Sequence, residues 1–346
     1  MAKEALLVVC PGRGTYNKAE LGYLKRHHAD NADFIAGADA VRSANGGEAL
    51  SALDGAERFS PALHTRGDIA SPLIHASAYL DFLDIDRERF SIAAVTGNSM
   101  GWYTALACAG AVTGGNGFAI VDAMGHHSQA GEAGGQVLLT LVDEDWRPVN
   151  GLRDRVFDLI TAIGGRAEHR LFLSIDLGGM LVLAGNEVGL AALLAEAPEM
   201  PGRGPMRLIN HGPFHTPLMQ GSSDGAKAAL PTSWFAAPER PMIDGRGHIW
   251  RPFASETEAL WDYTFGAQIL TPYDFTRALQ VAVKEFAPDR IVLLGPGDTL
   301  GGAIAQALIG IEWLGLTSKA DFQAMQADDP FLISMGRDEQ RARVTA

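Results

Sequence analysis

Gly97-Asn98-Ser99-Met100-Gly101 has the pattern Gly-x-Ser-x-Gly. It follows the apolar run Ile92–Val95, which is typical of a buried strand, and precedes Trp102–Ala109, which is rich in helix-forming residues. A serine between glycines at a strand-to-helix turn forms a nucleophile elbow, in which the turn exposes the hydroxyl and the first helical N–H groups face it. Such N–H groups stabilise the oxyanion of an acyl-transfer intermediate, so the stretch predicts acyl chemistry on Ser99. The alternative is that Ser99 only caps the helix.

The composition is that of a large globular protein. The chain has 346 residues, of which 47% are hydrophobic and 20% charged, enough for one large unit or two domains. Its two cysteines, Cys10 and Cys108, lie in apolar surroundings and are expected to be reduced core residues, which favours a cytoplasmic location. The net charge of −13 argues against nucleic acid as a partner. An acidic protein partner would need a local basic patch, which the net charge neither shows nor excludes.

The apolar segments are short. Ala5–Val9 is ended by Pro11-Gly12 and no cleavage-like site follows, so we interpret it as a first strand rather than a signal peptide. No run approaches the roughly 18 apolar residues that a membrane span needs. We therefore expect no membrane partner.

Strands alternate with helices over most of the chain. Ala5–Val9, Ile92–Val95 and Arg290–Leu294 are predicted strands, and Ser71–Phe82 and Phe275–Phe286 are predicted helices. This alternation is typical of a parallel sheet flanked by helices, so the expected fold class is α/β.

Residues 132–208 differ from the rest. They are predicted to form a strand, a helix, two strands, a helix and a strand, which is the ferredoxin-like order. We therefore expect a small inserted ferredoxin-like α+β subdomain at 132–208. Residues 1–131 and 209–317 would then form one discontinuous α/β core. The charged and polar tail, 318–346, is expected to be a loosely held C-terminal extension.

A serine nucleophile needs a base, and the chain has ten histidines. His215 stands out because it lies in the unusual segment Gly212-Pro213-Phe214-His215-Thr216-Pro217. Taken alone, this histidine could equally be a satisfied core residue.

Further motifs then follow in order along the chain. They are the loop Pro11-Gly12-Arg13-Gly14 after the first strand, the elbow, the segment ending in His215, the turn Leu270-Thr271-Pro272-Tyr273, and the late Gly295-Pro296-Gly297 loop. With these motifs, residues 5 to about 305 resemble the malonyl-CoA:acyl-carrier-protein transacylases and the related acyltransferase domains of polyketide synthases.

The resemblance implies a role for each matched position. Ser99 would take an acyl group from a thioester, and His215 would accept the serine proton. The backbone N–H groups of Arg13 and Met100 would form the oxyanion hole, and the main-chain carbonyl of Thr271 would orient His215. The implied fold is a hydrolase-like α/β domain with a ferredoxin-like insert. Acyl-CoA and a phosphopantetheinyl acyl carrier protein would be the substrates, with no cofactor.

The chain departs from this family in the acyl pocket. Met124 stands where malonyl-selective members have an arginine that binds the free carboxylate of the substrate. An unpaired carboxylate in an apolar pocket would cost several kcal/mol, so Met124 favours a neutral acyl group. Arg13 replaces a glutamine. It either supplies the missing guanidinium from another side of the pocket or points outward to a phosphate of coenzyme A.

Three more pocket residues are predicted from the alignment with the family. Asn98 replaces the histidine before the serine, and Trp102 would narrow the entrance. Phe214 precedes the catalytic histidine of the family, and members with phenylalanine there take acyl groups without an α-branch. No metal is expected, because Asp122 and His126, although spaced i, i+4, are more simply read as a solvated helix face.

We therefore predict a serine-dependent acyltransferase that moves an acyl group from acyl-CoA to an acyl carrier protein. One alternative is a hydrolase of the same fold that releases acyl groups from a carrier to water. A second alternative is a non-catalytic docking subunit, against which the joint presence of Ser99 and His215 argues.

Overall fold

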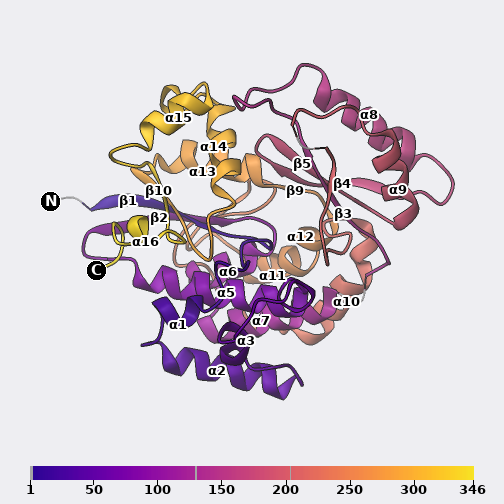
Figure 1. Cartoon of the computed structure of the whole chain (residues 1–346). Coiled ribbons are helices and arrows are strands. Elements are labelled where there is room, and N and C mark those ends of the chain that lie inside the picture. Colours follow the sequence, from indigo (N-terminus) through magenta and orange to yellow (C-terminus); the bar gives the residue numbers. More distant parts are fainter. Residues whose placement is uncertain (1–2, 129–130, 203) are drawn as a thin grey trace.

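Two mixed sheets organise the computed structural model, which describes residues 3–128, 131–202 and 204–346 (Figure 1). In the first sheet β11, β10, β1, β2 and β7 run parallel, and β8 pairs antiparallel with β7. In spatial order its strands are β11 (Leu332–Ser334), β10 (Arg290–Leu293), β1 (Glu4–Cys10), β2 (Phe90–Gly97), β7 (Met242–Ile243) and β8 (Ile249–Trp250).

Helices cover both faces of the first sheet, which is why the side chains of β1 from Leu6 to Cys10 are fully buried. On one face α6 (Gly101–Cys108) packs against β1 and β2, and α5 (Gly67–Asp84) and α7 (Gly114–His127) pack on α6. On the other face α13 (Phe275–Phe286) packs against β1, β2 and β7, with α14 (Gly301–Ile309) beside it. The predicted alternation of buried strands and covering helices is confirmed.

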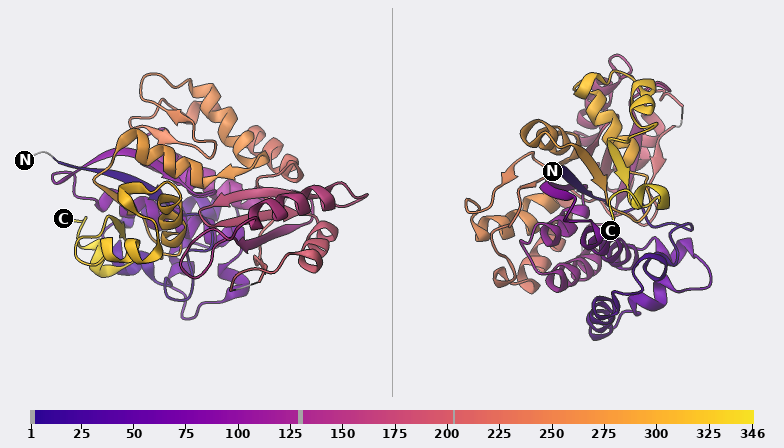
Figure 2. Two further views of the ribbon diagram at one scale, coloured as in Figure 1. Left: turned by 90° about the horizontal axis from the view of Figure 1, so that it is seen from above. Right: turned by 90° about the vertical axis from the view of Figure 1, so that its left-hand side faces the viewer.

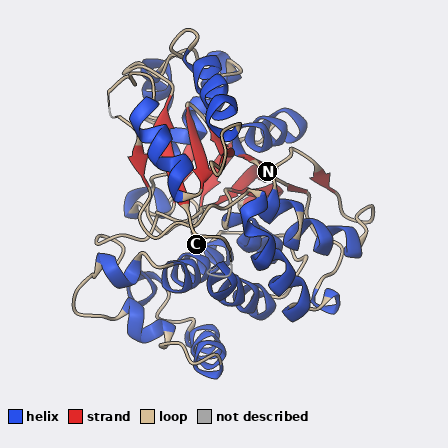
Figure 3. Ribbon diagram, turned by 90° about the vertical axis from the view of Figure 1, so that its right-hand side faces the viewer, coloured by secondary structure: helices blue, strands red, loops and turns tan. Residues whose placement is uncertain are grey.

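The second sheet has its own core. Its order is β6 (Met206–Arg207), β3 (Gly135–Thr140), β5 (Met180–Gly185), β4 (Leu171–Leu177) and β9 (Tyr273–Asp274). Helices α8 (Leu152–Gly164) and α9 (Glu187–Glu196) pack against this sheet and against each other (Figure 3). β9 belongs to a distant part of the chain, pairs parallel with β4 and leads directly into α13, so it connects the two sheets.

The remaining helices are short or lie at the periphery. They are α1 (Tyr23–His27), α2 (Ala32–Ala44), α3 (Leu50–Asp54), α4 (Pro61–His64), α10 (Gln220–Ala229), α11 (Thr257–Phe265), α12 (Ala267–Leu270), α15 (Lys319–Met325) and α16 (Asp338–Arg341), with 3-10 turns at Pro217–Met219, Thr232–Trp234 and Trp313–Gly315. None of the helices described here is both long and apolar enough to cross a lipid bilayer.

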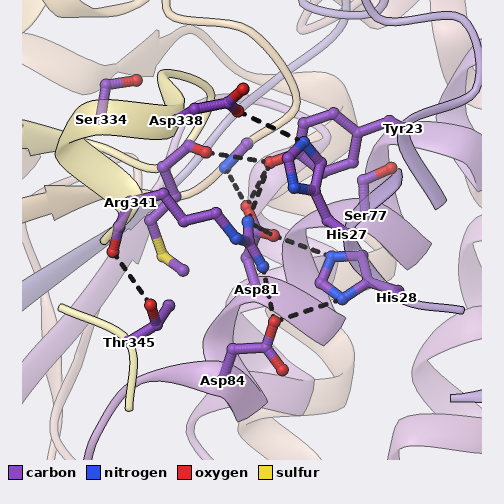
Figure 4. Close-up of polar contacts among 12 residues, drawn as sticks. Tyr23, His27, His28, Ser77, Asp81, Asp84, Ser334, Asp338, Arg341 and Thr345 are labelled. Atoms are coloured by element: carbon purple, nitrogen blue, oxygen red, sulfur yellow. Dashed lines mark hydrogen bonds and ion pairs between the residues drawn. The ribbon is translucent and has the colours of Figure 1, made fainter. Parts of the chain in front are cut away.

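The prediction of a loosely held tail at 318–346 is wrong. β11 extends the first sheet by pairing with β10, and the C-terminal segment ends near the start of β1 in both views of Figure 2. The guanidinium of Arg341 on α16 is buried, where it forms ion pairs with Asp81 and Asp84 of α5 (Figure 4). An arginine in a polar segment is typical of a solvated surface. The prediction failed because the carboxylates that bind Arg341 lie far away in the sequence.

Further hydrogen bonds complete this cluster. Asp81 also accepts hydrogen bonds from the hydroxyl of Tyr23 at 2.8 Å, the Nε2 of His28 at 2.9 Å and the backbone N–H of Gly295 at 2.7 Å. We call Tyr23, His28, Asp81, Asp84 and Arg341 the Arg341 network.

Candidate active site

The elbow has the predicted strand–turn–helix structure. β2 ends at Gly97, α6 begins at Gly101, and Ser99 between them has a left-handed φ of +53°. A Cβ on Gly101 would lie 2.3 Å from the carbonyl oxygen of Cys10, so only glycine lets the helix start this close to the end of β1. The strained turn holds Ser99 at the carboxyl edge of the sheet, the usual place for ligands in such folds.

His215 approaches Ser99 from the loop between β6 and α10. Its Nε2 lies 2.7 Å from the Ser99 Oγ, and its Nδ1 lies 2.7 Å from the carbonyl oxygen of Gln268. Because a carbonyl only accepts, Nδ1 carries the proton and Nε2 is free to accept the serine proton. Burial lowers the pKa of His215 to about 4, although the hydrogen bond to Gln268 opposes this. The imidazole is therefore neutral at physiological pH, as a base must be.

The residue that orients His215 is Gln268 and not Thr271, which corrects the prediction. Gln268 lies on α12, and in a helix its carbonyl would accept from the N–H four residues later. That residue is Pro272, which has no N–H, so the carbonyl of Gln268 remains free for His215. Thr271 is exposed, and its hydroxyl donates to the carbonyl of Ala267.

The side chain of Gln268 connects the same elements. Its amide donates to the carbonyl of Ser99 at 3.1 Å and accepts from the hydroxyl of Tyr103 at 2.9 Å. The sequence did not predict the role of Gln268, because every residue has a backbone carbonyl and the residue type does not show which one binds the histidine. The proline four positions later was the available signal.

The loop after β1 brings the backbone N–H of Arg13 to the elbow, which contains the N–H of Met100. A Cβ on Gly12 would lie 2.6 Å from the carbonyl oxygen of Asn98, so glycine is required for this close approach. Neither the backbone N–H of Arg13 nor that of Met100 donates a hydrogen bond within the described part of the chain. Both residues border the same cavity as Ser99, and their role as an oxyanion hole stays a prediction.

A small cavity of about 60 Å³ opens beside Ser99. Met124 and Phe214, two predicted pocket residues, lie in its wall together with Arg13, whose guanidinium carbon lies 5.8 Å from the centre of the Phe214 ring. We call it the acyl cavity. Its other walls are formed by Gly67 and Ser71 of α5, Tyr103 of α6, Val121, Gly125 and Ser128 on or beside α7, and Met219, Ser222, Gln268 and Ile269.

Two predicted pocket residues lie elsewhere. Trp102 is fully buried under the elbow, where its indole N–H donates to the hydroxyl of Thr264 at 3.0 Å and its ring packs edge-on against Tyr263. It cannot narrow an entrance, because the first turn of α6 directs it into the core. The side chain of Asn98 is also buried outside the cavity wall, so the pocket role predicted for it is wrong.

Carboxylates that could hold a metal are already paired with arginines. Asp122 is fully buried rather than on a solvated helix face, and it accepts a hydrogen bond from Arg42 at 2.7 Å. His28, Asp81 and Asp84 have metal-ligand spacing, but Arg341 engages both carboxylates.

The comparisons with known proteins give the fold. No protein-family model matches the sequence, and no curated protein matches it. Among solved structures, the malonyl CoA-acyl carrier protein transacylase of Coxiella burnetii is similar with a TM-score of 0.76 at 16% identity, covering 99% of each chain. The acyl-carrier-protein S-malonyltransferase of Burkholderia pseudomallei gives a TM-score of 0.75 at 17% identity over 98% of each chain.

A third solved structure contains a partner. It is a malonyl-transacylase in complex with a type II polyketide synthase acyl carrier protein, with a TM-score of 0.73 and 17% identity over 99% of each chain. The chain therefore has the fold of the malonyl-CoA:acyl carrier protein transacylases.

Proposed function

We propose that this protein transfers a short acyl group from acyl-CoA to the phosphopantetheine thiol of an acyl carrier protein, through an ester on Ser99. The observation that carries the proposal is the hydrogen-bonded series from Ser99 through His215 to Gln268, located at the edge of the acyl cavity. The fold supports it, because its solved relatives are named as malonyltransferases of acyl carrier proteins.

The first half-reaction follows from the hydrogen bonds. Nε2 of His215 accepts the Ser99 proton as Oγ attacks the thioester carbonyl. The negative charge on the carbonyl oxygen is stabilised by the backbone N–H groups of Arg13 and Met100. The intermediate then breaks its C–S bond, and the imidazolium returns the proton to the leaving thiolate of coenzyme A.

The second half-reaction reverses these roles. The carrier thiol loses its proton to His215 and attacks the Ser99 ester, and the serine leaves with that proton restored. No cofactor takes part in this scheme, because proton transfer and oxyanion stabilisation supply the chemistry. A carrier protein as acceptor is supported by the solved complex of a structurally similar transacylase with its acyl carrier protein.

The acyl cavity limits the size of the acyl group. A volume of about 60 Å³ corresponds to only a few water molecules, which suits a short chain. Met124 in the wall agrees with the expectation of a neutral acyl group, but the charged side chain of Arg13 borders the same cavity. A cation there favours an acyl group that carries a negative charge, so we do not extend the proposal to neutral chains.

We further propose that the chain is divided into a discontinuous core and an inserted subdomain. A hydrolase-like core made of 1–131 and 209–317 would carry the reacting groups, and 132–208 would be a ferredoxin-like subdomain. The separate hydrophobic cluster between the second sheet and α8 and α9 supports this division. Residues 318–346 belong with the core, because β11 pairs in its sheet. We place the protein in the cytoplasm on its two unpaired, buried cysteines.

The test is the mass of the intact protein after exposure to a panel of acyl-CoAs. We expect one acyl group to be added to the unaltered chain and none to Ser99→Ala, because removing a nucleophile costs orders of magnitude in rate. Acylation of Ser99→Ala would contradict the assignment. Adding a phosphopantetheinyl carrier protein should then remove the acyl group from Ser99 much faster than buffer does. Equal rates with and without the carrier would instead support the hydrolase.

A further inference from the structure

Arg13 has hydrogen-bonding capacity that the protein does not use. Its Nη2 donates to the carbonyl oxygens of Thr65 at 2.9 Å and Asn210 at 2.7 Å. Its Nε is enclosed by protein and has no partner, and Nη1 makes no hydrogen bond in the described ranges. A guanidinium that is buried with unused N–H groups is costly, and the Nη1 group is the one that remains for an acceptor from outside the chain.

Arg13 also lacks a counter-ion. No carboxylate of the described residues lies within salt-bridge distance of its guanidinium. The nearest acidic influence, Asp68, is bound by Arg66 through two hydrogen bonds at 3.1 and 2.6 Å. Burial lowers the pKa of Arg13 to about 10, with Asp68 partly opposing the shift, so the side chain is still charged at neutral pH.

The surroundings of Arg13 favour an anion. The guanidinium carbon lies 5.8 Å from the centre of the Phe214 ring, which also borders the acyl cavity. A Cβ on Gly67 would lie 3.5 Å from Nη1, so the first residue of α5 is adjacent to the guanidinium. No side chain caps the first N–H groups of α5, and the positive end of this helix therefore adds to the positive charge of Arg13.

We propose that Arg13 selects the acyl group by binding a carboxylate at the end of the acyl chain while Ser99 reacts with the thioester. This proposal rests on the proposed function and names its substrate class. The positive charge of Arg13 lies on the loop after β1, whereas α7 has Met124 at the position where malonyl-selective transacylases have an arginine. A carboxylate at Arg13 would pair the unmatched charge and accept hydrogen bonds from Nη1.

The test compares malonyl-CoA, which carries a terminal carboxylate, with acetyl-CoA, which does not. We expect Arg13→Gln to lower kcat/KM for acylation of Ser99 by malonyl-CoA at least about tenfold, the effect of losing one charge-assisted hydrogen bond. The ratio of the malonyl-CoA value to the acetyl-CoA value should fall by a similar factor, because the acetyl group has no carboxylate for Arg13 to bind. Arg13→Gln combined with Met124→Arg should restore part of the malonyl-CoA rate, because a guanidinium again enters the cavity. Arg66→Gln is the matched control, since it removes a nearby arginine that does not border the cavity.

Three results would overturn the proposal. An equal loss for both thioesters in Arg13→Gln would mean that Arg13 only braces the loops at Thr65 and Asn210. A loss seen with both CoA thioesters but not with the corresponding pantetheine thioesters would place a coenzyme A phosphate on Arg13. Preference of the unaltered protein for acetyl-CoA would support a neutral acyl group.

A binding measurement separates this proposal from the proposed function. Calorimetry with the Ser99→Ala protein should show tighter binding of malonyl-CoA than of acetyl-CoA, and Arg13→Gln in the same background should remove the difference. If the unaltered protein formed no acyl-enzyme, the proposed function would fail while this preference could still be observed. Equal binding of the two thioesters by Ser99→Ala protein would contradict the role of Arg13 whatever the chemistry on Ser99.

Discussion

The Arg341 network and the acyl cavity both bury an arginine, but they complete its interactions differently. Arg341 has two carboxylate partners, and Asp81 accepts from four groups in all. Arg13 has two carbonyl partners, no carboxylate within salt-bridge distance among the described residues, and an enclosed Nε without an acceptor. Both sites have charged groups removed from water, but carboxylates match the charge of Arg341 and none matches the charge of Arg13 among the described residues.

This difference separates structural from functional polar groups. Ion pairing with Asp81 and Asp84 offsets the cost of burying Arg341, and removing one of these carboxylates would leave a buried charge without its partner. An open cluster costs stability in the free protein and becomes complete only when a ligand binds. The comparison therefore predicts that changes in the network alter stability, whereas changes around the cavity alter reactivity.

The largest expected effect is on the reacting histidine. His215→Ala should slow acylation of Ser99 about 10²–10⁴-fold, because Ser99 would lose the base that accepts its proton. The acylation rate would be measured from the mass of the intact protein in samples quenched at successive times. Urea denaturation would show whether the variant is folded. Near-normal acylation by this variant would show that another group is the base.

Breaking the network should mainly reduce stability. Asp81→Asn should lower the free energy of unfolding by about 3–5 kcal/mol, because Arg341 would be left buried with one carboxylate fewer. Urea denaturation would measure this change. Asp84→Asn is the matched control with a smaller expected loss, since the Asp84 side chain is 30% exposed. A large loss of acylation rate per folded Asp81→Asn molecule would contradict the separation of the two regions.

The pH dependence of acylation should report the burial of His215. Since burial lowers its pKa to about 4, the base is neutral above that value. The kcat/KM for Ser99 acylation should fall as the pH drops through 4, and His215 should contribute no acid limb near its ordinary value of about 6.5. An acid limb centred near 6.5 and assigned to His215 by titration would contradict the burial of the imidazole.

The role of Pro272 gives a smaller effect. Pro272→Ala would add an N–H that can bind the Gln268 carbonyl in competition with His215, and we expect acylation to slow by up to about tenfold. The pH at which the rate falls should also move to a lower value, because the hydrogen bond to Gln268 raises the pKa of His215. Thr271→Ala is the matched control and should leave the rate unchanged, because the Thr271 side chain is exposed. Equal effects of both substitutions would argue against the Gln268 contact.

The smallest effect concerns His28. Burial alone would lower its pKa, but contacts with Asp81 and Asp84 outweigh burial, so the pKa is raised above 6.5 in the folded protein. The protonated imidazole therefore stabilises the fold fully below pH 6.5, and this contribution is lost as the pH rises through the folded-state pKa. Urea denaturation on both sides of this window should show the loss in the unaltered protein but not in His28→Gln. The same slope in both proteins would contradict the assignment.

The sequence was most informative where the backbone itself is special. The glycines around Ser99, the loop at Gly12 and the segment ending in His215 predicted the elbow and the histidine that contacts Ser99, because these turns require particular residues in the chain itself. The long strands and helices were also predictable, since their apolar residues recur with a local period. The strands β7, β8 and β11 were missed, because two or three residues show no period.

The sequence by itself determined the α/β class, the elbow, the choice of His215 and the presence of Arg13 and Met124. Only the tertiary structure decided that Gln268 orients His215, that Trp102 lies in the core, that Arg341 closes a buried network, and that the Arg13 guanidinium borders the acyl cavity. The physical reason is that periodicity and turn chemistry are local, whereas the partner of a carbonyl or a charge is set by distant segments. An arginine in a loop and an arginine in a tail look alike in sequence, and the carboxylates of Asp81 and Asp84 beside only one of them make the difference.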